Sequence, residues 1–269
     1  MTAGSFMSRN GKKTRLQGSF TDPDGILATF YTTERAGAFR LSDGGGPFGF
    51  DITTALQVDY LIRSYGCDGI VETGSFLGDT ASYMAARYPH LPLRTCDVSG
   101  NYASFARARL APHTNAAVLT GNSADLLPDM IAGMRRPFVY LDAHWYDVWP
   151  LQQELSVLEH AVVAIDDFDI GHPRFSFDAY DGVRCGPELV AEALPDQRDI
   201  YVGDPEAVYP YPCLQTGRRS GTAFLLRDLE PAALRASSMF RRIPLHPGVR
   251  MPSWTSVPAQ SAVLIGQEV

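Results

Sequence analysis

Two short runs of sequence decide the fold of this chain: Val139-Tyr140-Leu141-Asp142-Ala143-His144 and, further on, Val162-Val163-Ala164-Ile165-Asp166-Asp167. Each is an apolar run of the kind that forms a strand buried on both faces, and each ends in carboxylates. If the two strands are neighbours in a parallel sheet, their carboxyl ends open on the same edge, where ligands of open α/β sheets bind. Carboxylates gathered at one point repel one another unless a cation or a proton lies between them. The two runs therefore indicate a metal site formed by Asp142, Asp166 and Asp167, with a histidine beside it.

The segments around these runs alternate between helical and strand patterns. The expected helices are 52–65, 80–87, 102–110, 124–131 and 151–159, and the expected strands are 69–72, 91–97, 117–120, 138–142 and 161–167. Five strands separated by helical segments predict an α/β fold with a doubly wound parallel sheet. Two further strands, 200–202 and 222–226, have no clear helix between them, so we expect them to pair antiparallel.

The chain is expected to form one large domain with a segment on either side. Its 269 residues, 45% of them hydrophobic, are enough for one α/β domain with a substantial core, which we place at residues 51–250. Gly44-Gly45-Gly46-Pro47 interrupts regular structure, so residues 1–50 are expected to form a flexible arm or lid. Residues 251–269 have no clear periodicity and are expected to form a C-terminal tail.

Charge and cysteine content narrow the class of protein. The net charge of −7, from 23 basic and 30 acidic residues, disfavours a sequence-independent nucleic-acid binder. The four cysteines are scattered with no CxxC pair, which indicates neither a zinc site nor a disulfide framework and fits a reducing cytoplasm. No run approaches the roughly 18 apolar residues of a membrane helix, and residues 1–20 lack the apolar core of a signal peptide. We expect a cytoplasmic protein that acts on a small molecule; whether it forms a homo-oligomer stays open.

A glycine turn, Glu72-Thr73-Gly74-Ser75-Phe76-Leu77-Gly78, follows the first expected strand. Glycines in such a turn let the backbone pass close to a ligand. The spacing departs from the G-x-G-x-x-G fingerprint, which favours a smaller nucleoside over a pyrophosphate and disfavours a nicotinamide dehydrogenase. Asp97 ends the second strand 23 residues after Gly74, where a carboxylate can take both ribose hydroxyls. The alternative is that the glycines only make a turn and Asp97 caps a helix.

Taken in order along the chain, these motifs resemble a known family. The run 71–80, Asp97, residues 121–125 and residues 140–142 resemble the class I S-adenosylmethionine-dependent methyltransferases over roughly residues 52–230. The resemblance implies a Rossmann-like, mostly parallel sheet of seven strands, the seventh antiparallel. It implies the methionine end of the cofactor near the glycine turn, the ribose at Asp97 and the adenine near Asn122 and Ser123. The cofactor-binding residues that it implies are Glu72, Gly74, Ser75, Gly78, Asp97, Asn122, Ser123 and Asp142.

The carboxylates indicate which group of methyltransferases within this family the chain resembles. Asp142 followed by Asp166-Asp167 resembles the metal-dependent O-methyltransferases, both the catechol type and the group that acts on sugars of macrolide and aminocoumarin antibiotics. In those enzymes such residues hold a magnesium ion, and oxygen ligands suit a hard divalent cation. The sugar-modifying group has a carboxylate base two residues beyond its first metal aspartate, where this chain has His144. An imidazole can accept the proton of a hydroxyl near neutral pH, so Asp142 and His144 are the expected catalytic residues.

Several residues near these runs are candidates for an acceptor site. Aromatic side chains in loops at the catalytic edge could form an apolar wall, and basic side chains nearby could hold an anionic or hydroxylated substrate. The aromatic candidates are Trp145, Tyr146, Trp149, Phe168, Phe175, Phe177 and Tyr180, and the basic ones are His172, Arg174, Arg184, Arg218 and Arg219.

The sequence thus predicts an S-adenosylmethionine-dependent methyltransferase that uses Mg²⁺ to methylate a hydroxyl of a small molecule. A secondary-metabolite or sugar-like acceptor is implied by the resemblance alone. One alternative is a metal-independent N- or carboxyl-methyltransferase, with His144 or Asp142 orienting the nucleophile. Taken singly, His144 could only hydrogen-bond a loop or the cofactor, Asp142 could face cofactor and solvent, and Asp166 or Asp167 could cap a turn. The other alternative is a non-enzymatic regulatory or scaffold protein that keeps the nucleoside pocket.

Overall fold

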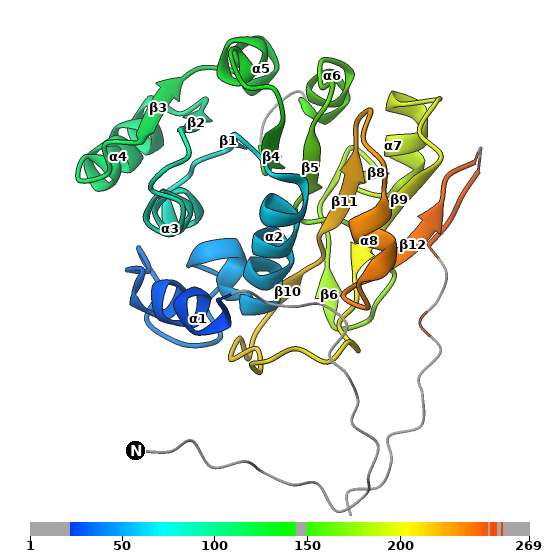
Figure 1. Cartoon of the computed structure of the whole chain (residues 1–269), viewed down its shortest axis with the longest axis horizontal. Helices are drawn as coiled ribbons and strands as arrows, with labels where there is room; N and C mark the ends of the chain where they lie inside the picture. Colours follow the sequence, from blue (N-terminus) through cyan, green and yellow to red (C-terminus); the bar gives the residue numbers. More distant parts are fainter. Residues whose placement is uncertain (1–21, 144–148, 247, 252–253, 255–269) are drawn as a thin grey trace, which may run out of the picture.

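The computed structural model describes residues 22–143, 149–246, 248–251 and 254, and an eight-stranded sheet forms its centre (Figure 1). The strand order is β12-β9-β11-β5-β4-β1-β2-β3. The strands are β1 (Gly69–Thr73), β2 (Leu93–Asp97), β3 (Ala116–Thr120), β4 (Pro137–Leu141), β5 (Val162–Ile165), β9 (Asp199–Gly203), β11 (Ala223–Leu226) and β12 (Phe240–Pro244). The first five are parallel, and β11 lies antiparallel between β5 and β9. The predicted doubly wound α/β fold class is confirmed.

The sheet has one strand more than the seven expected, because β12 pairs antiparallel with β9 at the edge. Its sequence, Phe-Arg-Arg-Ile-Pro, carries two arginines in five residues. An edge strand needs apolar side chains only where it meets the core, here at Phe240 and Ile243. The pattern is therefore too weak to predict a strand from sequence.

Helices cover both faces of the sheet (Figure 1). One face carries α2 (Ile52–Tyr65), α3 (Asp79–Arg87), α4 (Gly100–Leu110) and α8 (Ala232–Ala236), and the other carries α5 (Ser123–Ile131), α6 (Leu151–Ser156) and α7 (Pro187–Ala193). Successive residues of the central strands point to opposite faces, so Phe138 and Tyr140 join one apolar cluster while Val139 and Leu141 join the other. In the described ranges no helix is long and apolar enough to cross a membrane.

Part of the segment expected as a flexible arm is packed into the domain. The helix α1 (Pro23–Thr32) buries Ile26 and Phe30 completely, and the short helix η1 (Pro47–Phe50) buries Phe48 and Phe50. The described residues 22–50 therefore differ from the prediction and form a layer over α2 and α3. Ile26 and Phe30 do lie at helical spacing, but one such pair within a polar, glycine-containing segment is too short a pattern to predict a packed helix. At the other end, Trp254 of the expected tail donates its indole N–H to the carbonyl of Ile170 at 2.7 Å.

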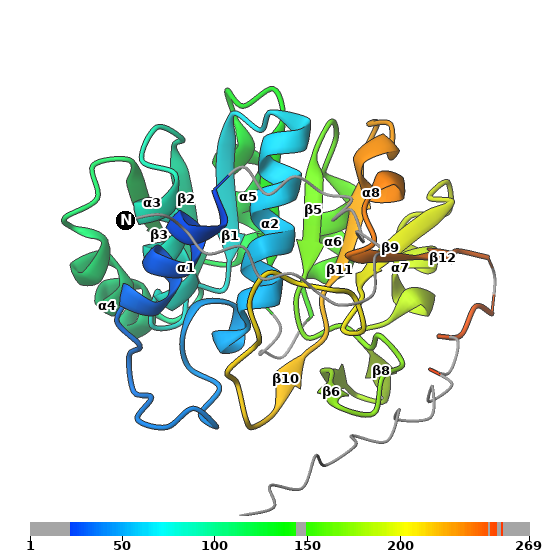
Figure 2. The ribbon, with the colours of Figure 1, turned by 60° about the horizontal axis from the view of Figure 1, so that its bottom comes forward.

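The parallel strands end together at one edge of the sheet. Thr73 of β1 pairs with Cys96 of β2 and Leu141 of β4, and Leu141 pairs with Ile165 of β5. The turns after these strands consequently share this edge. Figure 2 shows the segments that cover it: the connection between α1 and η1, and the short strands β6 (Phe175–Ser176), β7 (Ala179–Tyr180), β8 (Val183–Arg184) and β10 (Arg219–Ser220).

The connection between α1 and η1 is bonded at two places along this edge. Its backbone N–H groups at Ala36 and Gly46 donate to the carboxylate of Asp79, the first residue of α3, at 3.0 and 2.8 Å. The carbonyl of Leu41 accepts from the N–H of Thr216, in the connection that leads to β10, at 3.2 Å. The segment between α1 and η1 is thus hydrogen-bonded both to the start of α3 and to the connection that precedes β10.

Candidate functional site

The glycine turn after β1 is shaped by its contact with the end of β4. Gly74 has a φ of +78°, and a Cβ built on it would lie 2.3 Å from the backbone oxygen of Asp142. Only glycine fits such a close approach and such a φ. The N–H groups of Gly74 and Ser75 both donate to the carbonyl of Cys96, at 2.9 and 2.8 Å. The hydroxyl of Ser75 is buried without a hydrogen-bond partner among the described residues, as expected of a group reserved for a ligand.

Glu72, two residues before this glycine, is buried in β1, with 1% of its surface exposed. Its carboxylate accepts a hydrogen bond from the Thr95 hydroxyl on β2. Burial raises the pKa of Glu72 to about 8; the Thr95 bond lowers it, and the carboxylates of Asp97 and Asp79 raise it further. Glu72 is therefore mostly protonated at neutral pH and can both donate and accept a hydrogen bond.

Asp97, the last residue of β2, is hydrogen-bonded to the glycine turn. Its two carboxylate oxygens accept from the N–H groups of Phe76 and Ser99, each at 2.8 Å. Burial raises its pKa, while these two backbone bonds lower it. Each oxygen keeps a second lone pair, so the carboxylate can still accept hydrogen bonds from a ribose.

Asn122 and Ser123 begin α5 next to Asp97. The N–H of Gly121 donates to the carbonyl of Asp97 at 3.0 Å, which fixes this turn against β2. Asn122 caps α5 by accepting from the N–H of Ala124 at 3.1 Å, and Ser123 is buried. The cap uses only the amide oxygen of Asn122, and its NH₂ group remains a donor. The structure thus brings the turns after β1, β2 and β3 together at one edge.

The aspartates at the ends of β4 and β5 form one cluster. Each of Asp142, Asp166 and Asp167 offers a carboxylate oxygen, and these three atoms lie within 4.8 Å of one another. The spacing follows from the register, because the N–H of Asp166 donates to the carbonyl of Leu141 at 3.0 Å. Asp167 has a φ of +46°, a left-handed conformation that aspartate adopts more readily than most residues.

Electrostatic repulsion dominates this cluster. Burial, followed by the charges of Asp166 and Asp167, raises the pKa of Asp142 well above its usual value. Burial and then the charge of Asp167 raise the pKa of Asp166 to about 8, while nearby donor groups of Tyr140, Asp167 and Thr222 lower it. Such shifts mark carboxylates that need a proton or a cation between them. A hard divalent ion with oxygen ligands fits this donor set.

Side chains of β10 and of the residues on either side of it support the cluster from one side. Thr222 donates from its hydroxyl to Asp166 at 3.3 Å, and the Ser220 hydroxyl donates to Asp167. The guanidinium of Arg218 lies 3.5 Å from both Asp167 and Asp178. His144, the expected base, lies outside the described residues, and so do Trp145 and Tyr146.

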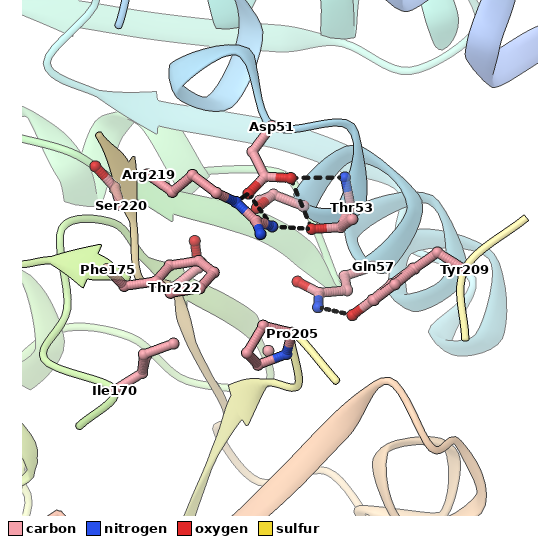
Figure 3. Close-up of a pocket in the computed structure, with 12 residues that line it drawn as sticks. Asp51, Thr53, Gln57, Ile170, Phe175, Pro205, Tyr209, Arg219, Ser220 and Thr222 are labelled. Atoms are coloured by element: carbon pink, nitrogen blue, oxygen red, sulfur yellow. Dashed lines mark hydrogen bonds and ion pairs between the residues drawn. The ribbon is translucent and has the colours of Figure 1, made fainter. Parts of the chain in front are cut away.

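A pocket is lined by residues of α2, of β10 and of the chain that follows β9 (Figure 3). Its cavity volume is only about 10 Å³, and about 240 Å³ of empty space is counted when the part open to solvent is included. Ser220 and Thr222, the residues that donate to the cluster, lie in its wall, so the pocket adjoins Asp166 and Asp167. Of the acceptor-site candidates, Phe175 and Arg219 line it.

A buried ion pair forms one side of this pocket (Figure 3). The guanidinium of Arg219 lies 2.6 Å from the carboxylate of Asp51, and their side chains are 8% and 3% exposed. Asp51 also caps α2 by accepting from the N–H of Thr53 at 2.9 Å. Arg219 lies over the ring of Phe175, 4.4 Å from its centroid. Since the two charges neutralise each other, the pair presents little net charge to the pocket.

The opposite side of the pocket is neutral. Gln57 donates from its amide to the hydroxyl of Tyr209 at 2.6 Å, and Ile170 and Pro205 add apolar surface. Sequence reasoning missed Asp51, Gln57 and Tyr209, because they lie far from the carboxylates along the chain. The only local signal was Asp51 before the helical pattern of 52–65, which marks a helix cap.

The other acceptor-site candidates lie elsewhere. Phe168 is fully buried in the core, whereas Tyr180 is exposed. Arg184 is largely exposed, 3.4 Å from Asp169. His172 is buried against the rings of Phe175 and Trp254.

Comparisons with known proteins return methyltransferases among the solved structures. No protein-family model matches the chain, and no curated protein matches it either. The O-methyltransferase TomG of Streptomyces achromogenes, solved with S-adenosylmethionine, is 23% identical over 64% of this chain and 78% of its own, with a TM-score of 0.44. An O-methyltransferase of Bacillus cereus, solved with S-adenosylhomocysteine, is 15% identical over 77% of this chain and 91% of its own, with a TM-score of 0.44. The methyltransferase domain of bacterial CtHen1 is 12% identical over 67% of this chain and 99% of its own, with a TM-score of 0.47.

Proposed function

We propose that this protein is an S-adenosylmethionine-dependent methyltransferase that methylates a hydroxyl of a small-molecule acceptor with the help of Mg²⁺. One observation carries the proposal: the glycine turn after β1 packs directly on the backbone of Asp142, at 2.3 Å from the position of a Gly74 Cβ. The motif that resembles a methyl-donor site and the carboxylate cluster are therefore parts of one site.

The cofactor side has the groups that the donor needs. Glu72 and the hydroxyl of Ser75, which has no hydrogen-bond partner in the part of the chain that the structure describes, lie at the turn where the methionine end would bind. Asp97 would accept from the ribose hydroxyls, and the amide of Asn122 would meet the adenine edge. When bound, the donor supplies a sulfonium whose methyl group is transferred to a nucleophile.

On the metal side, Asp142, Asp166 and Asp167 would hold the ion. Their raised pKa values are the expected property of ligands that repel one another until a cation is bound. When bound, Mg²⁺ lowers the pKa of an acceptor hydroxyl and fixes its position. We assign His144 the removal of the hydroxyl proton, since it follows Asp142 by two residues.

The acceptor would bind at the mouth of the pocket beside the cluster, where the space is open to solvent. Among the described residues that line this pocket, the charged side chains are Asp51 and Arg219, which neutralise each other, and the others present hydroxyl, amide and apolar groups. This lining suits an uncharged acceptor that carries hydroxyl groups. A phosphorylated acceptor would find no unpaired cation among the residues that line the pocket.

Calorimetric titrations of the full chain test the proposal. We expect S-adenosylhomocysteine to bind, Mg²⁺ to bind to the wild type, and Asp166→Asn to lose Mg²⁺ binding while keeping S-adenosylhomocysteine binding. Asp129→Asn, at an exposed site, is the matched control and should change neither affinity. Binding of NADH in place of S-adenosylhomocysteine would refute the methyltransferase. Binding of S-adenosylhomocysteine without any Mg²⁺ binding would favour the metal-independent alternative.

His144→Ala tests the assigned base separately. We expect its methylation rate to fall by about 10²- to 10⁴-fold, the range for removal of a general base, with S-adenosylhomocysteine affinity unchanged. A His144→Ala variant with full activity would exclude this role.

A further inference from the structure

The positively charged side chain of Arg218 lies against the carboxylate cluster. Arg218 is the residue before β10, and its Nη2 atom lies 3.5 Å from a carboxylate oxygen of Asp167. The same nitrogen lies 3.5 Å from the carboxylate of Asp178. Asp167 is one of the three clustered aspartates, whereas Asp178 is not. One guanidinium nitrogen thus bridges a proposed metal ligand and a carboxylate outside the cluster.

The guanidinium is held in this place although the Arg218 side chain as a whole is 54% exposed. Its Nε donates to the hydroxyl of Ser176 on β6, and this hydroxyl donates to the backbone carbonyl of Arg219 at 3.1 Å. Asp178 is fixed beside the cluster by its own backbone, because its N–H donates to the carbonyl of Asp167 at 2.9 Å. A hydroxyl and two carboxylates therefore hold the charged end of Arg218.

The oxygen of Asp167 that faces Arg218 already interacts with two groups of the chain. The Ser220 hydroxyl donates to this same oxygen, Oδ1. A positive charge fixed beside a carboxylate compensates its negative charge and opposes the approach of a second cation. Arginine is not deprotonated in proteins, so a change of pH does not remove this opposition. The positive charge beside Asp167 is therefore permanent.

From this arrangement we infer that Arg218 is a positioning residue of the metal site: an internal counter-cation that competes with the divalent ion for Asp167 and lowers the affinity for Mg²⁺. This inference rests on the proposed function, because it takes the cluster as the metal site. Asp178 gives the guanidinium a second carboxylate, so Arg218 can release Asp167 and still form an ion pair. The strength of metal binding is then set by a residue that is not itself a ligand.

Calorimetric titration of the full-length protein with Mg²⁺ tests this inference. In low salt, we expect Arg218→Met to bind Mg²⁺ at least about threefold more tightly than the wild type. The difference should shrink in about 0.5 M NaCl, since salt screens the charge of a half-exposed side chain. Arg218→Lys keeps the charge and should stay within about twofold of the wild type. S-adenosylhomocysteine affinity should be the same in all of these proteins.

Arg184→Met is the matched control. It removes the same charge from an exposed arginine of β8, which lies 3.4 Å from Asp169, outside the cluster. We expect its Mg²⁺ affinity to equal that of the wild type. If Arg184→Met tightens binding as much as Arg218→Met does, net charge and not the contact with Asp167 is responsible, and the inference is overturned.

The remaining outcomes separate this inference from the proposed function. If Arg218→Met binds Mg²⁺ no more tightly than the wild type, Arg218 does not compete for Asp167 and the proposed function stands. If neither protein binds Mg²⁺ while both bind S-adenosylhomocysteine, the metal dependence of the proposed function fails and this inference falls with it. If Arg218→Met does not fold, Arg218→Gln replaces it, with the same expected gain in affinity.

Discussion

The two halves of the site are built from different interactions. On the cofactor side, the turns after β1, β2 and β3 are joined by backbone N–H groups that donate to the carbonyl of Cys96 and to Asp97. On the acceptor side, charged side chains dominate: the three clustered aspartates and the buried pair of Asp51 and Arg219. These backbone hydrogen bonds are formed without any ligand, whereas the crowded carboxylates repel one another until a cation or proton lies between them. We conclude that backbone hydrogen bonds preorganise the cofactor half, whereas the structure of the acceptor half depends on compensation of its charged side chains.

The largest effect should come from breaking the buried ion pair of the acceptor side. Arg219→Met leaves the carboxylate of Asp51 buried without its cation, which should cost about 3 to 5 kcal/mol of unfolding free energy. Urea denaturation measures this loss. The double variant with Asp51→Asn should recover most of it, since asparagine also caps a helix.

Arg218→Met is the matched control for that experiment. Its side chain is 54% exposed and its ion pairs are long, at 3.5 Å, so the loss should stay below about 1 kcal/mol. If Arg218→Met and Arg219→Met lose equal amounts of unfolding free energy, burial of the ion pair between Asp51 and Arg219 does not determine its contribution to stability.

The next largest effect concerns the thermal stability of the protein, which should depend on pH and Mg²⁺ together. The raised pKa values of Asp142 and Asp166 mean that the folded chain binds protons that the unfolded chain has released. Without Mg²⁺, their contribution to stability is therefore complete below pH 3.8 and is lost as pH rises through about 8. Mg²⁺ needs these groups deprotonated, so it should raise the melting temperature more at pH 8.5 than at pH 6.

Saturating Mg²⁺ at about 100 times its Kd should stabilise the protein by about 2.7 kcal/mol at the higher pH. Scanning calorimetry measures the shift, and Asp166→Asn should abolish it. An equal shift at both pH values would show that Mg²⁺ binds elsewhere.

On the cofactor side, Gly74→Ala should lower the free energy of unfolding by less than Arg219→Met does. It should also weaken the binding of S-adenosylhomocysteine directly. A non-glycine residue at a φ of +78° costs about 1 to 3 kcal/mol, and the new Cβ must also push away the backbone of Asp142. We expect at least a tenfold loss of S-adenosylhomocysteine affinity. Gly133→Ala has a similar φ of +83° but open space around it, so the difference between the two variants isolates the contact with Asp142.

The smallest effect is expected at the start of α5. Asn122→Ala removes the cap of this helix and should cost about 1 kcal/mol in urea denaturation. Asn122→Ser keeps a capping oxygen but loses the amide NH₂, so it should restore stability without restoring S-adenosylhomocysteine affinity. If Asn122→Ser binds as tightly as the wild type, the amide does not contact the adenine.

Much of this arrangement could be predicted from the sequence. The helical period of 52–65 and the apolar runs before Asp97, Asp142 and Asp166 placed the central elements, because strands buried on both faces need continuous apolar residues. The predicted cluster of Asp142, Asp166 and Asp167 also follows from a local rule, since parallel strands end at one edge.

The remainder depends on contacts between distant parts of the chain. Asp51 and Arg219 are 168 residues apart, and nothing in the neighbourhood of either residue indicates the other. The sequence around Glu154 of α6 marks this buried residue as unusual. It lies three residues after Leu151 and four before Leu158, on the apolar face of its helical pattern, where an acidic residue conflicts with the period.

The segment between α1 and η1 limits how the site could be re-engineered. Its backbone is bonded to Asp79 next to the glycine turn and to Thr216 before β10. A chimera that imports the acceptor half of another enzyme while keeping this cofactor half would separate these two attachments. Residues 33–46 must therefore be exchanged together with 213–220, so the smallest transplantable unit of this site is discontinuous in sequence.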